Sequence, residues 1–296
     1  MVYKSKLKLI ILLLILVSAI GCTTTNSQEE EKASKISLNE LKISSVSYLE
    51  EEDLSENFGY LAEYLSMELG IPVTFEYVME YDVLVDLLGE GNIDLAYLGP
   101  VTYVQAKEKY GGVELVSVGL SSGSPVYYSY IVAGKDSQLE SISDISGKSF
   151  GFASDHSTSG HLIPRLELSK GGVLREDLLG YEHFSSHDLV AQAVISGEVD
   201  AGGIIDSVYK KNKDSLKVIK QSGPIPQLPF VAKPGISEDD LALIIRAFKK
   251  LNPENNNHLR ILKGLDKGYT GFTIAKDSDY NIIREAMVTT YGTLDI

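Results

Sequence analysis

The sequence predicts an α/β protein built from two lobes that enclose a cleft. Strand-like segments alternate with segments of helical periodicity in the order βαβαβ, first over residues 41–98 and again over residues 149–205. The two stretches also share a pattern: Leu87–Ala96 and Ala193–Gly202 each read as the end of a helix, a glycine, an apolar residue, an aspartate and a strand. A single α/β unit has no reason to repeat this pattern, so the repetition indicates two similar units.

The first unit is read from apolar spacing and from glycine and proline stops. In order, its predicted elements are a strand at Leu41–Tyr48, a helix at Phe58–Leu69, a strand at Val73–Val78, a helix at Tyr81–Leu88 and a buried strand at Ile93–Leu98. Gly70 ends the first helix and Gly99-Pro100 ends the last strand.

The second unit follows the same order. Its predicted elements are a strand at Ser149–Ala153, a helix at Leu162–Lys170, a strand at Leu179–Phe184, a helix at Asp188–Ser196 and a strand at Asp200–Ile205. Open α/β sheets bind ligands at the carboxyl ends of their strands. We therefore expect the loops at Gly99-Pro100 and Asp206 to face one cleft.

The chain is expected to cross between the lobes twice. It crosses at residues 127–133 and returns at residues 225–231, where the prolines at 224, 226 and 229 favour extended backbone. These two segments are the predicted hinge. Lobe 1 is then formed by residues 38–126 together with 232–296, and lobe 2 by residues 127–231.

The N-terminus has the pattern of a lipoprotein signal peptide over residues 1–21. Lys4, Lys6 and Lys8 precede an apolar run at Leu9–Val17, and Cys22, the single cysteine of the chain, occupies the position that is acylated in lipoproteins. Residues 22–37 are polar and predicted to be a flexible tether. An uncleaved anchoring helix is the alternative, and both place the protein outside the cytoplasm at the cell membrane.

The charge of the chain excludes nucleic acid as a partner. The formal net charge is −14, and removal of residues 1–21 takes away three lysines and no acids, which changes it to −17. An anionic ligand would therefore have to be held by hydrogen bonds and helix dipoles at short range. A monomer is the expected state.

Residues Ser157-Thr158-Ser159-Gly160 lie between a strand and a helix and form a candidate anion site. Hydroxyl groups and the backbone N–H groups of a first helical turn can donate to one oxyanion without a permanent counter-ion. The alternative is that the hydroxyls only cap the helix.

The chain resembles the phosphate/phosphite/phosphonate-binding (PhnD-like) family of ABC-transporter solute-binding proteins, which has the two-lobed type II periplasmic-binding-protein fold. The matching segments are Asp94–Tyr103, Gly147–Phe152, Ser157–Pro164 and Ser186–Asp188 with Gln192–Val194. This resemblance implies capture of a phosphorus oxyanion and its delivery to an ABC permease with its ATPase. A receptor of a sensor kinase with the same fold, or a binder of another small oxyanion, is the alternative.

The resemblance also implies the roles of individual residues. Those with implied contacts to the ligand are Ser157, Thr158 and Ser159 as donors, Gly160 as the point of close backbone approach, His187 as a ring N–H donor, and Tyr81, with Tyr97 and Tyr103 as further candidates, as pocket-lining rings. Asp206 matches one of two carboxylates that hold an ammonium in aminophosphonate binders. The second has no counterpart in residues 225–229, so an aminophosphonate is not expected. Asp206 is expected to select a protonated oxyanion, or else to act only as a capping or lobe-bridging residue.

The sequence gives no indication of an enzyme. It lacks Gly-x-Ser-x-Gly, a P-loop, His-Glu-x-x-His and any cysteine pair, so no catalytic residue, metal site or cofactor is expected.

Overall fold

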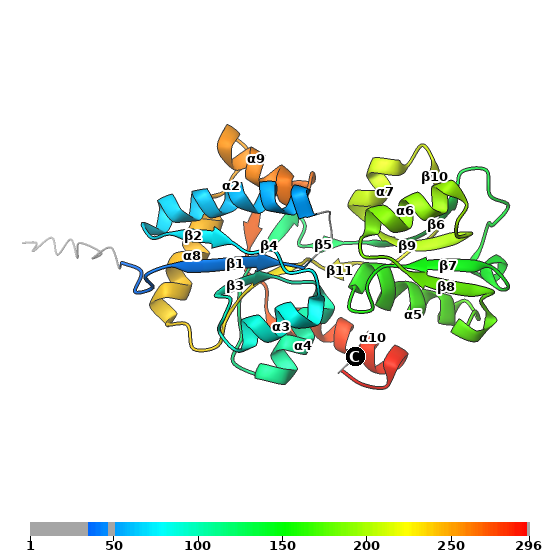
Figure 1. Cartoon of the computed structure of the whole chain (residues 1–296), viewed down its shortest axis with the longest axis horizontal. Helices are drawn as coiled ribbons and strands as arrows, with labels where there is room; N and C mark the ends of the chain where they lie inside the picture. Colours follow the sequence, from blue (N-terminus) through cyan, green and yellow to red (C-terminus); the bar gives the residue numbers. More distant parts are fainter. Residues whose placement is uncertain (1–34, 47–50, 295–296) are drawn as a thin grey trace, which may run out of the picture. The chain divides into compact units, whose positions relative to one another are not determined.

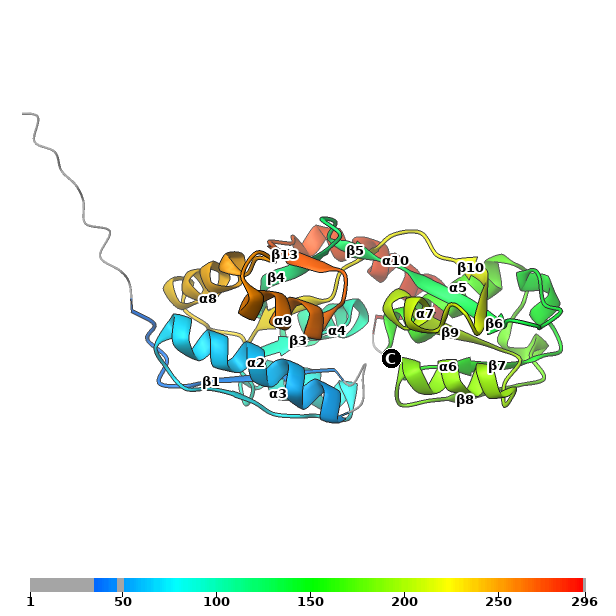
Figure 2. The same cartoon turned by 90° about the horizontal axis from the view of Figure 1, so that it is seen from above.

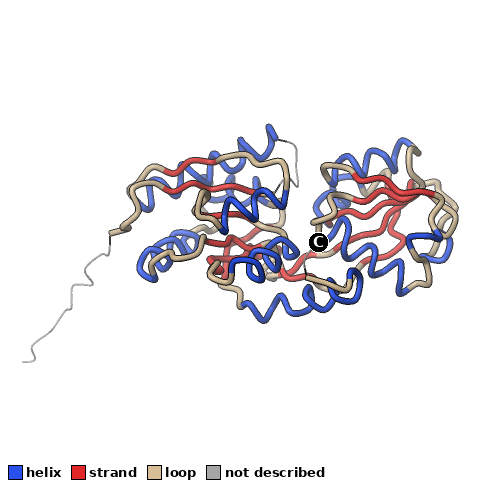
Figure 3. The backbone as a smooth tube through the Cα atoms, turned by 60° about the horizontal axis from the view of Figure 1, so that its bottom comes forward, coloured by secondary structure: helices blue, strands red, loops and turns tan. Residues whose placement is uncertain are grey.

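The computed structural model describes residues 35–46 and 51–294. The predicted signal peptide, Cys22 and most of the predicted tether lie outside these residues. The described chain forms two α/β lobes, each a mixed sheet flanked by helices (Figures 1 and 3), as predicted. No helix in the described ranges is long and apolar enough to cross a membrane.

The chain is packed into lobe 1 earlier than predicted. Ile36 is buried, and the backbone N–H and hydroxyl of Ser37 donate to the Asp240 carboxylate at 2.6 and 2.5 Å. The tether predicted to run to residue 37 therefore ends before Ile36, because an apolar side chain and a bonded serine fix the last two residues.

The first sheet has six strands in the order β13-β4-β12-β3-β1-β2. Their bounds are β1 Leu41–Ser45, β2 Val73–Phe75, β3 Leu95–Tyr97, β4 Glu114–Ser121, β12 Pro229–Ala232 and β13 Tyr269–Thr273. β1 is parallel to β2 and β3, whereas β12 is antiparallel to β3 and β4.

Helices cover both faces of this sheet. They are α2 Glu51–Leu69, α3 Tyr81–Gly89, α4 Pro100–Tyr110, α8 Glu238–Lys250, α9 Asn256–Leu265, the short η4 Asp277–Tyr280 and α10 Asn281–Tyr291. In Figure 1, α2 and α9 lie above the strands and α3 and α4 below them. Helix α2 starts at Glu51 and not at the predicted Phe58, since three acids occupy its first turn and Leu54 is buried.

The second sheet has five strands in the order β10-β6-β9-β7-β8. They are β6 Ser129–Gly134, β7 Ser149–Phe152, β8 Gly180–His183, β9 Ala201–Ile205 and β10 Leu216–Gln221. The helical segments are η1 Ile142–Ile145, η2 Thr158–Leu162, α5 Ile163–Lys170, η3 Arg175–Asp177, α6 His187–Ser196 and α7 Asp206–Asn212. The helix predicted at residues 162–170 thus begins four residues earlier, as the π-helical turn η2.

Two short strands connect the sheets. β5, Val126–Tyr127, pairs antiparallel with β11, Ile225–Pro226, so the predicted crossovers meet at their first residues. The crossover predicted at residues 127–133 is shorter than expected, because residues 129–133 pair within the second sheet as part of β6. Helix α10 packs against α4 and also against α5 and η2 (Figure 2). The predicted boundaries between the lobes are wrong at one place: β12 pairs within the first sheet, so residues 229–231 belong to lobe 1 and not to lobe 2. The other boundaries stay a prediction.

Candidate functional site

The cradle, Ser157–Gly160, forms the start of η2 and is almost completely buried. Only 3–4% of the surface of Ser157, Thr158 and Ser159 is exposed. Ser157 is the N-cap, and its Oγ accepts a hydrogen bond from the Gly160 N–H at 3.1 Å. Ser157 therefore caps the helix and is also the first residue of the candidate ligand site.

The π-helical turn has a local cause in Pro164. A proline has no N–H, so it cannot donate to the carbonyl of Gly160. That carbonyl instead accepts from the N–H of Ala153, at the end of β7, at 3.0 Å. The first turn widens, and the N–H groups of His161 and Leu162 both point to the Ser157 carbonyl at 3.1 and 3.0 Å. π-Helical turns inside helices are frequent at functional sites.

His187 lies directly against the cradle. Its Nε2 is 3.2 Å from Ser157 Oγ, and its Nδ1 accepts from the backbone N–H of Ile205 at 3.1 Å. Since Nδ1 is an acceptor, the ring proton must sit on Nε2. Burial lowers the pKa of His187 to about 4, so the ring is neutral at pH 7. His187 is thus a neutral donor aimed at the cradle.

Thr158 meets the first lobe. The N–H of Val101, in the first turn of α4, donates to Thr158 Oγ1 at 2.9 Å. The N-terminus of α4 and the N-terminus of η2 therefore come together at one hydrogen bond, and both ends carry N–H groups that lack partners inside their helices. The predicted loop at Gly99-Pro100 reaches the site in this way.

Tyr127 also lies beside the cradle, although the sequence pattern did not indicate a ligand contact for it. Burial raises the pKa of its hydroxyl well above the usual range, and hydrogen bonds with the Ser159 and Thr158 side chains oppose that shift. Its position in β5 could have indicated a place near the ligand, because a strand that connects the two lobes must run past the cleft between them.

The three predicted tyrosines differ in position. Tyr81, the first residue of α3, is buried and lines the pocket described below, and its contact with a ligand stays a prediction. Tyr97 instead hydrogen-bonds the Tyr269 hydroxyl at 2.6 Å within an aromatic core. Tyr103 donates to Asp277 at 2.7 Å and packs on Tyr280. The structure gives these two rings packing roles inside lobe 1, which differs from the pocket-lining role that we predicted.

Asp206 begins α7 at the end of β9 and already has a cationic partner. Its Oδ2 is 2.9 Å from Lys210 Nζ, one helical turn away. Burial raises the pKa of the Asp266 carboxyl, in the first lobe, and the nearby charge of Asp206 raises it further. Asp206 therefore lies in a carboxylate and lysine cluster that includes both lobes, and Asp266 was missed from sequence.

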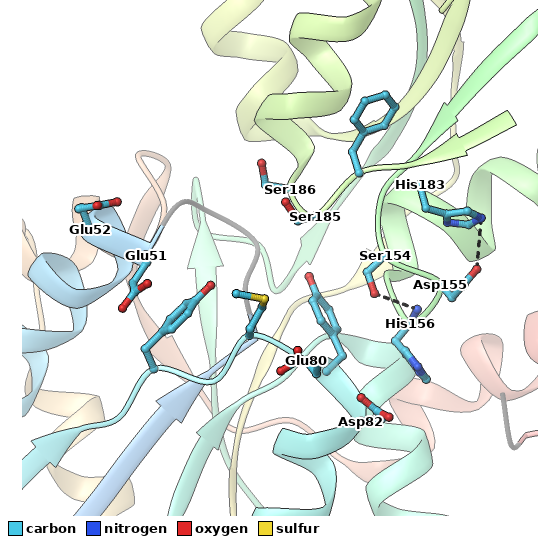
Figure 4. A pocket seen from close by; sticks show the side chains of 14 residues that line it. Glu51, Glu52, Glu80, Asp82, Ser154, Asp155, His156, His183, Ser185 and Ser186 are labelled. Atoms are coloured by element: carbon cyan, nitrogen blue, oxygen red, sulfur yellow. Dashed lines mark hydrogen bonds and ion pairs between the residues drawn. The ribbon is translucent and has the colours of Figure 1, made fainter.

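A pocket of about 600 Å³ opens next to the cradle (Figure 4). Tyr81 and Ser186, which precedes His187, lie on its wall. The first-lobe side is acidic, with Glu51, Glu52, Glu80 and Asp82, whereas the second-lobe side carries hydroxyl, histidine and aspartate groups: Ser154, Asp155, His156, His183, Ser185 and Ser186.

Comparisons with known proteins show which proteins the chain resembles. The Phosphate-import protein PhnD of Mycolicibacterium smegmatis is 30% identical over 180 residues, which cover 56% of each chain. The Phosphonates-binding periplasmic protein of Escherichia coli is 25% identical over 225 residues, which cover 72% of this chain and 64% of that protein. The chain thus spans 56–64% of the length of these relatives.

The structure of PhnD1 from Prochlorococcus marinus in complex with methylphosphonate has a TM-score of 0.78, at 21% identity, and the match covers 85% of this chain and 98% of that one. This similarity shows the fold. The family model described as "ABC transporter, phosphonate, periplasmic substrate-binding protein" matches residues 43–280, most of the chain. The chain therefore belongs to the family of periplasmic substrate-binding proteins of phosphonate ABC transporters.

Proposed function

We propose that the chain captures a phosphorus oxyanion at the cradle and delivers it to an ABC permease and its ATPase. The observation that carries this proposal is the buried group of neutral donors formed by the three cradle hydroxyls and the Nε2–H of His187. Neutral donors and helix N-termini stabilise an oxyanion and still allow its release. The relatives are binding proteins and not enzymes, which supports binding without chemistry.

Closure of the lobes would complete the site. The Val101 N–H from α4 donates to Thr158 Oγ1 of the cradle, so an oxyanion held there would lie near both the N-terminus of α4 and that of η2. The paired strands β5 and β11 are the proposed hinge, and Tyr127 in β5 would couple hinge movement to the cradle.

The ligand is proposed to lack an ammonium group. Lys210 already neutralises Asp206, and the crossover at residues 225–229 contains no acid. An aminophosphonate would have to compete with Lys210 for a carboxylate. Phosphate, phosphite and a small alkylphosphonate remain as candidate ligands. The description of one relative names phosphate, and that of one similar structure names methylphosphonate.

The protein is further proposed to be an extracytoplasmic lipoprotein, anchored by acylation of Cys22. The replacement Cys22→Ser would then move the chain from the membrane fraction to the soluble fraction, and an unchanged distribution would contradict the lipid anchor.

Isothermal titration tests the site and the ligand class. The purified chain is titrated with phosphate, phosphite, methylphosphonate and 2-aminoethylphosphonate, with sulfate as an unrelated oxyanion. One of the first three is expected to bind with the highest affinity. The double replacement of Ser157 and Thr158 by Ala is expected to cost about 2–4 kcal/mol of binding free energy, because two charge-assisted hydrogen bonds are lost.

Ser185→Ala is the matched control, since this exposed hydroxyl lies on the pocket wall outside the cradle. Its affinity should equal that of the wild type. Tightest binding of the aminophosphonate would contradict the ligand assignment, and an unchanged affinity of the double variant would reduce the cradle to a helix cap.

A further inference from the structure

A second cluster of polar side chains lies beside the cradle and has no part in the proposed oxyanion site. Asp155 follows β7, His161 belongs to η2, and His183 ends β8. Asp155 Oδ1 is 3.5 Å from His161 Nε2 and 3.4 Å from His183 Nε2. The three potential ligand atoms all lie within 4.8 Å of one another. Figure 4 shows the contact between Asp155 and His183 at the pocket wall.

The hydrogen bonds of the two histidines fix where their protons are. His161 Nδ1 is 2.8 Å from the Asp155 carbonyl, and His183 Nδ1 is 3.0 Å from the Ala153 carbonyl. A carbonyl only accepts, so both Nδ1 atoms carry the proton. In the neutral rings both Nε2 atoms then present lone pairs to a carboxylate oxygen. Such an arrangement is unfavourable unless a proton or a metal cation lies between these atoms, and the geometry below favours a metal ion.

We propose that Asp155, His161 and His183 bind a divalent late transition-metal ion, with Zn²⁺ as the reference ion. Ligands of a tetrahedral Zn²⁺ at 2.0–2.1 Å are separated by about 3.3 Å, close to the two distances above. Nδ1–H groups held by carbonyls are the usual outer contacts of metal-binding histidines, because they orient the ring and expose Nε2. Two histidines and one carboxylate also match the donor preference of zinc.

The surroundings allow an ion to enter and to keep an open coordination position. The His161 side chain is 5% exposed, whereas those of Asp155 and His183 are 66% and 30% exposed, and both line the pocket. Four carboxylates on the opposite wall, Glu51, Glu52, Glu80 and Asp82, attract cations. The positive charge of Arg165 opposes the binding of a cation here. Its guanidinium stacks on the Tyr291 ring, whose hydroxyl contacts His161 Nδ1.

An ion bound to this cluster would also hold the cradle segment in place. Asp155 lies two residues before Ser157, and His161 directly follows Gly160, so the two ligands flank the cradle. An ion would tie both ends of the cradle segment to the edge strand β8. The sequence reading found no metal site because the three ligands share no local motif, and only the pairing of β7 with β8 brings His183 to the other two.

Metal titration of the purified full chain tests the site. Zn²⁺ binding is measured by competition with a chromophoric chelator, and Co²⁺ is used as a spectroscopic probe, since four-coordinate Co²⁺ has intense visible bands. The wild type is expected to bind one ion at micromolar concentration. His183→Ala and Asp155→Asn should weaken binding by more than about 100-fold, because loss of a ligand exceeds the usual loss of an outer contact.

His156→Ala is the matched control. His156 lies in the same segment and lines the same pocket, but its ring contacts the Gln105 amide and not the cluster. It should bind Zn²⁺ like the wild type. Absence of Zn²⁺ binding by the wild type, wild-type binding by either ligand variant, or an equal loss in His156→Ala would overturn the proposal. The Asp155 side chain is exposed and that of His183 is partly exposed, and equal unfolding curves without metal would confirm that both variants fold.

Discussion

His187 connects the cradle to the second sheet through both of its ring nitrogens. Nδ1 satisfies the buried N–H of Ile205, and Nε2–H is directed at Ser157. A second proton on Nδ1 would break the bond to Ile205 and place a charge in a fully buried position. The ring is therefore suited to donate to an anion while remaining neutral.

The buried ring predicts a dependence of stability on pH. The pKa of His187 is lowered by burial to about 4, against about 6.5 in the unfolded chain. The unfolded state then binds more protons between these values, so this contribution is complete above pH 6.5 and declines as the pH falls towards 4. The loss should reach about 2 kcal/mol at pH 5.

Urea unfolding at several pH values measures this effect. His187→Gln keeps a donor near Ser157 and cannot titrate, so the difference in unfolding free energy between wild type and variant should shrink as the pH falls from 7 to 5. A difference that does not change with pH would show that His187 titrates normally.

At the scale of elements, the repeated pattern noticed in the sequence has one structural role in both lobes. The Asp94 carboxylate accepts from the N–H of Lys42 in β1 at 2.7 Å. The Asp200 carboxylate accepts from the N–H of Ser149 in β7 at 2.9 Å. Each aspartate thus links the start of a central strand to the strand beside it, which explains why the pattern repeats.

The contact between η2, β7 and α6 depends on the absence of a side chain at Gly160. An added Cβ would lie 2.4 Å from Ala153 Cβ, 2.7 Å from His187 Cε1 and 3.0 Å from Ser157 Oγ. Gly160→Ala is therefore expected to lower the unfolding free energy by about 1–3 kcal/mol and to weaken oxyanion binding, because His187 must move.

Gly59→Ala is the control for this replacement, examined by the same unfolding and titration experiments. Gly59 lies in α2, and an added Cβ would meet nothing within 4 Å. Alanine should stabilise the helix by up to about 1 kcal/mol and leave binding unchanged. Wild-type stability and affinity of Gly160→Ala would show that the cradle is not closely packed.

At the scale of the whole molecule, an acidic protein is proposed to bind an anion. The net charge of −14 and the four carboxylates on the pocket wall repel an anion at long range, so attraction must arise from hydrogen bonds and helix N-termini at contact distance. Salt screens long-range interactions far more than buried contacts.

The affinity for the phosphorus oxyanion should therefore change by less than about threefold between 50 and 500 mM salt. Titration in sodium gluconate measures this, because its bulky anion competes poorly for a small cradle. A loss of about tenfold or more would indicate that distant lysines or arginines hold the ligand, contrary to the neutral cradle.

The α/β order, the crossovers and the cradle were predictable because each depends on local spacing: the apolar periodicity of Tyr81–Leu88, the prolines near residue 225, and three hydroxyls before a helix. Tyr97 and Tyr103 were not distinguishable from Tyr81, since an aromatic residue on a buried strand or helix can face a core or a pocket with the same sequence pattern.

The sequence by itself determined the α/β order, the repeated unit and the segment Ser157–Gly160, because hydrogen bonding within a helix or turn depends on neighbouring residues. Only the tertiary structure decided which ring nitrogen of His187 donates, that Lys210 and Asp266 surround Asp206, and that Asp155 and His161 meet His183. These arrangements depend on strand order and on packing between lobes, and both are set by contacts between residues far apart in the chain.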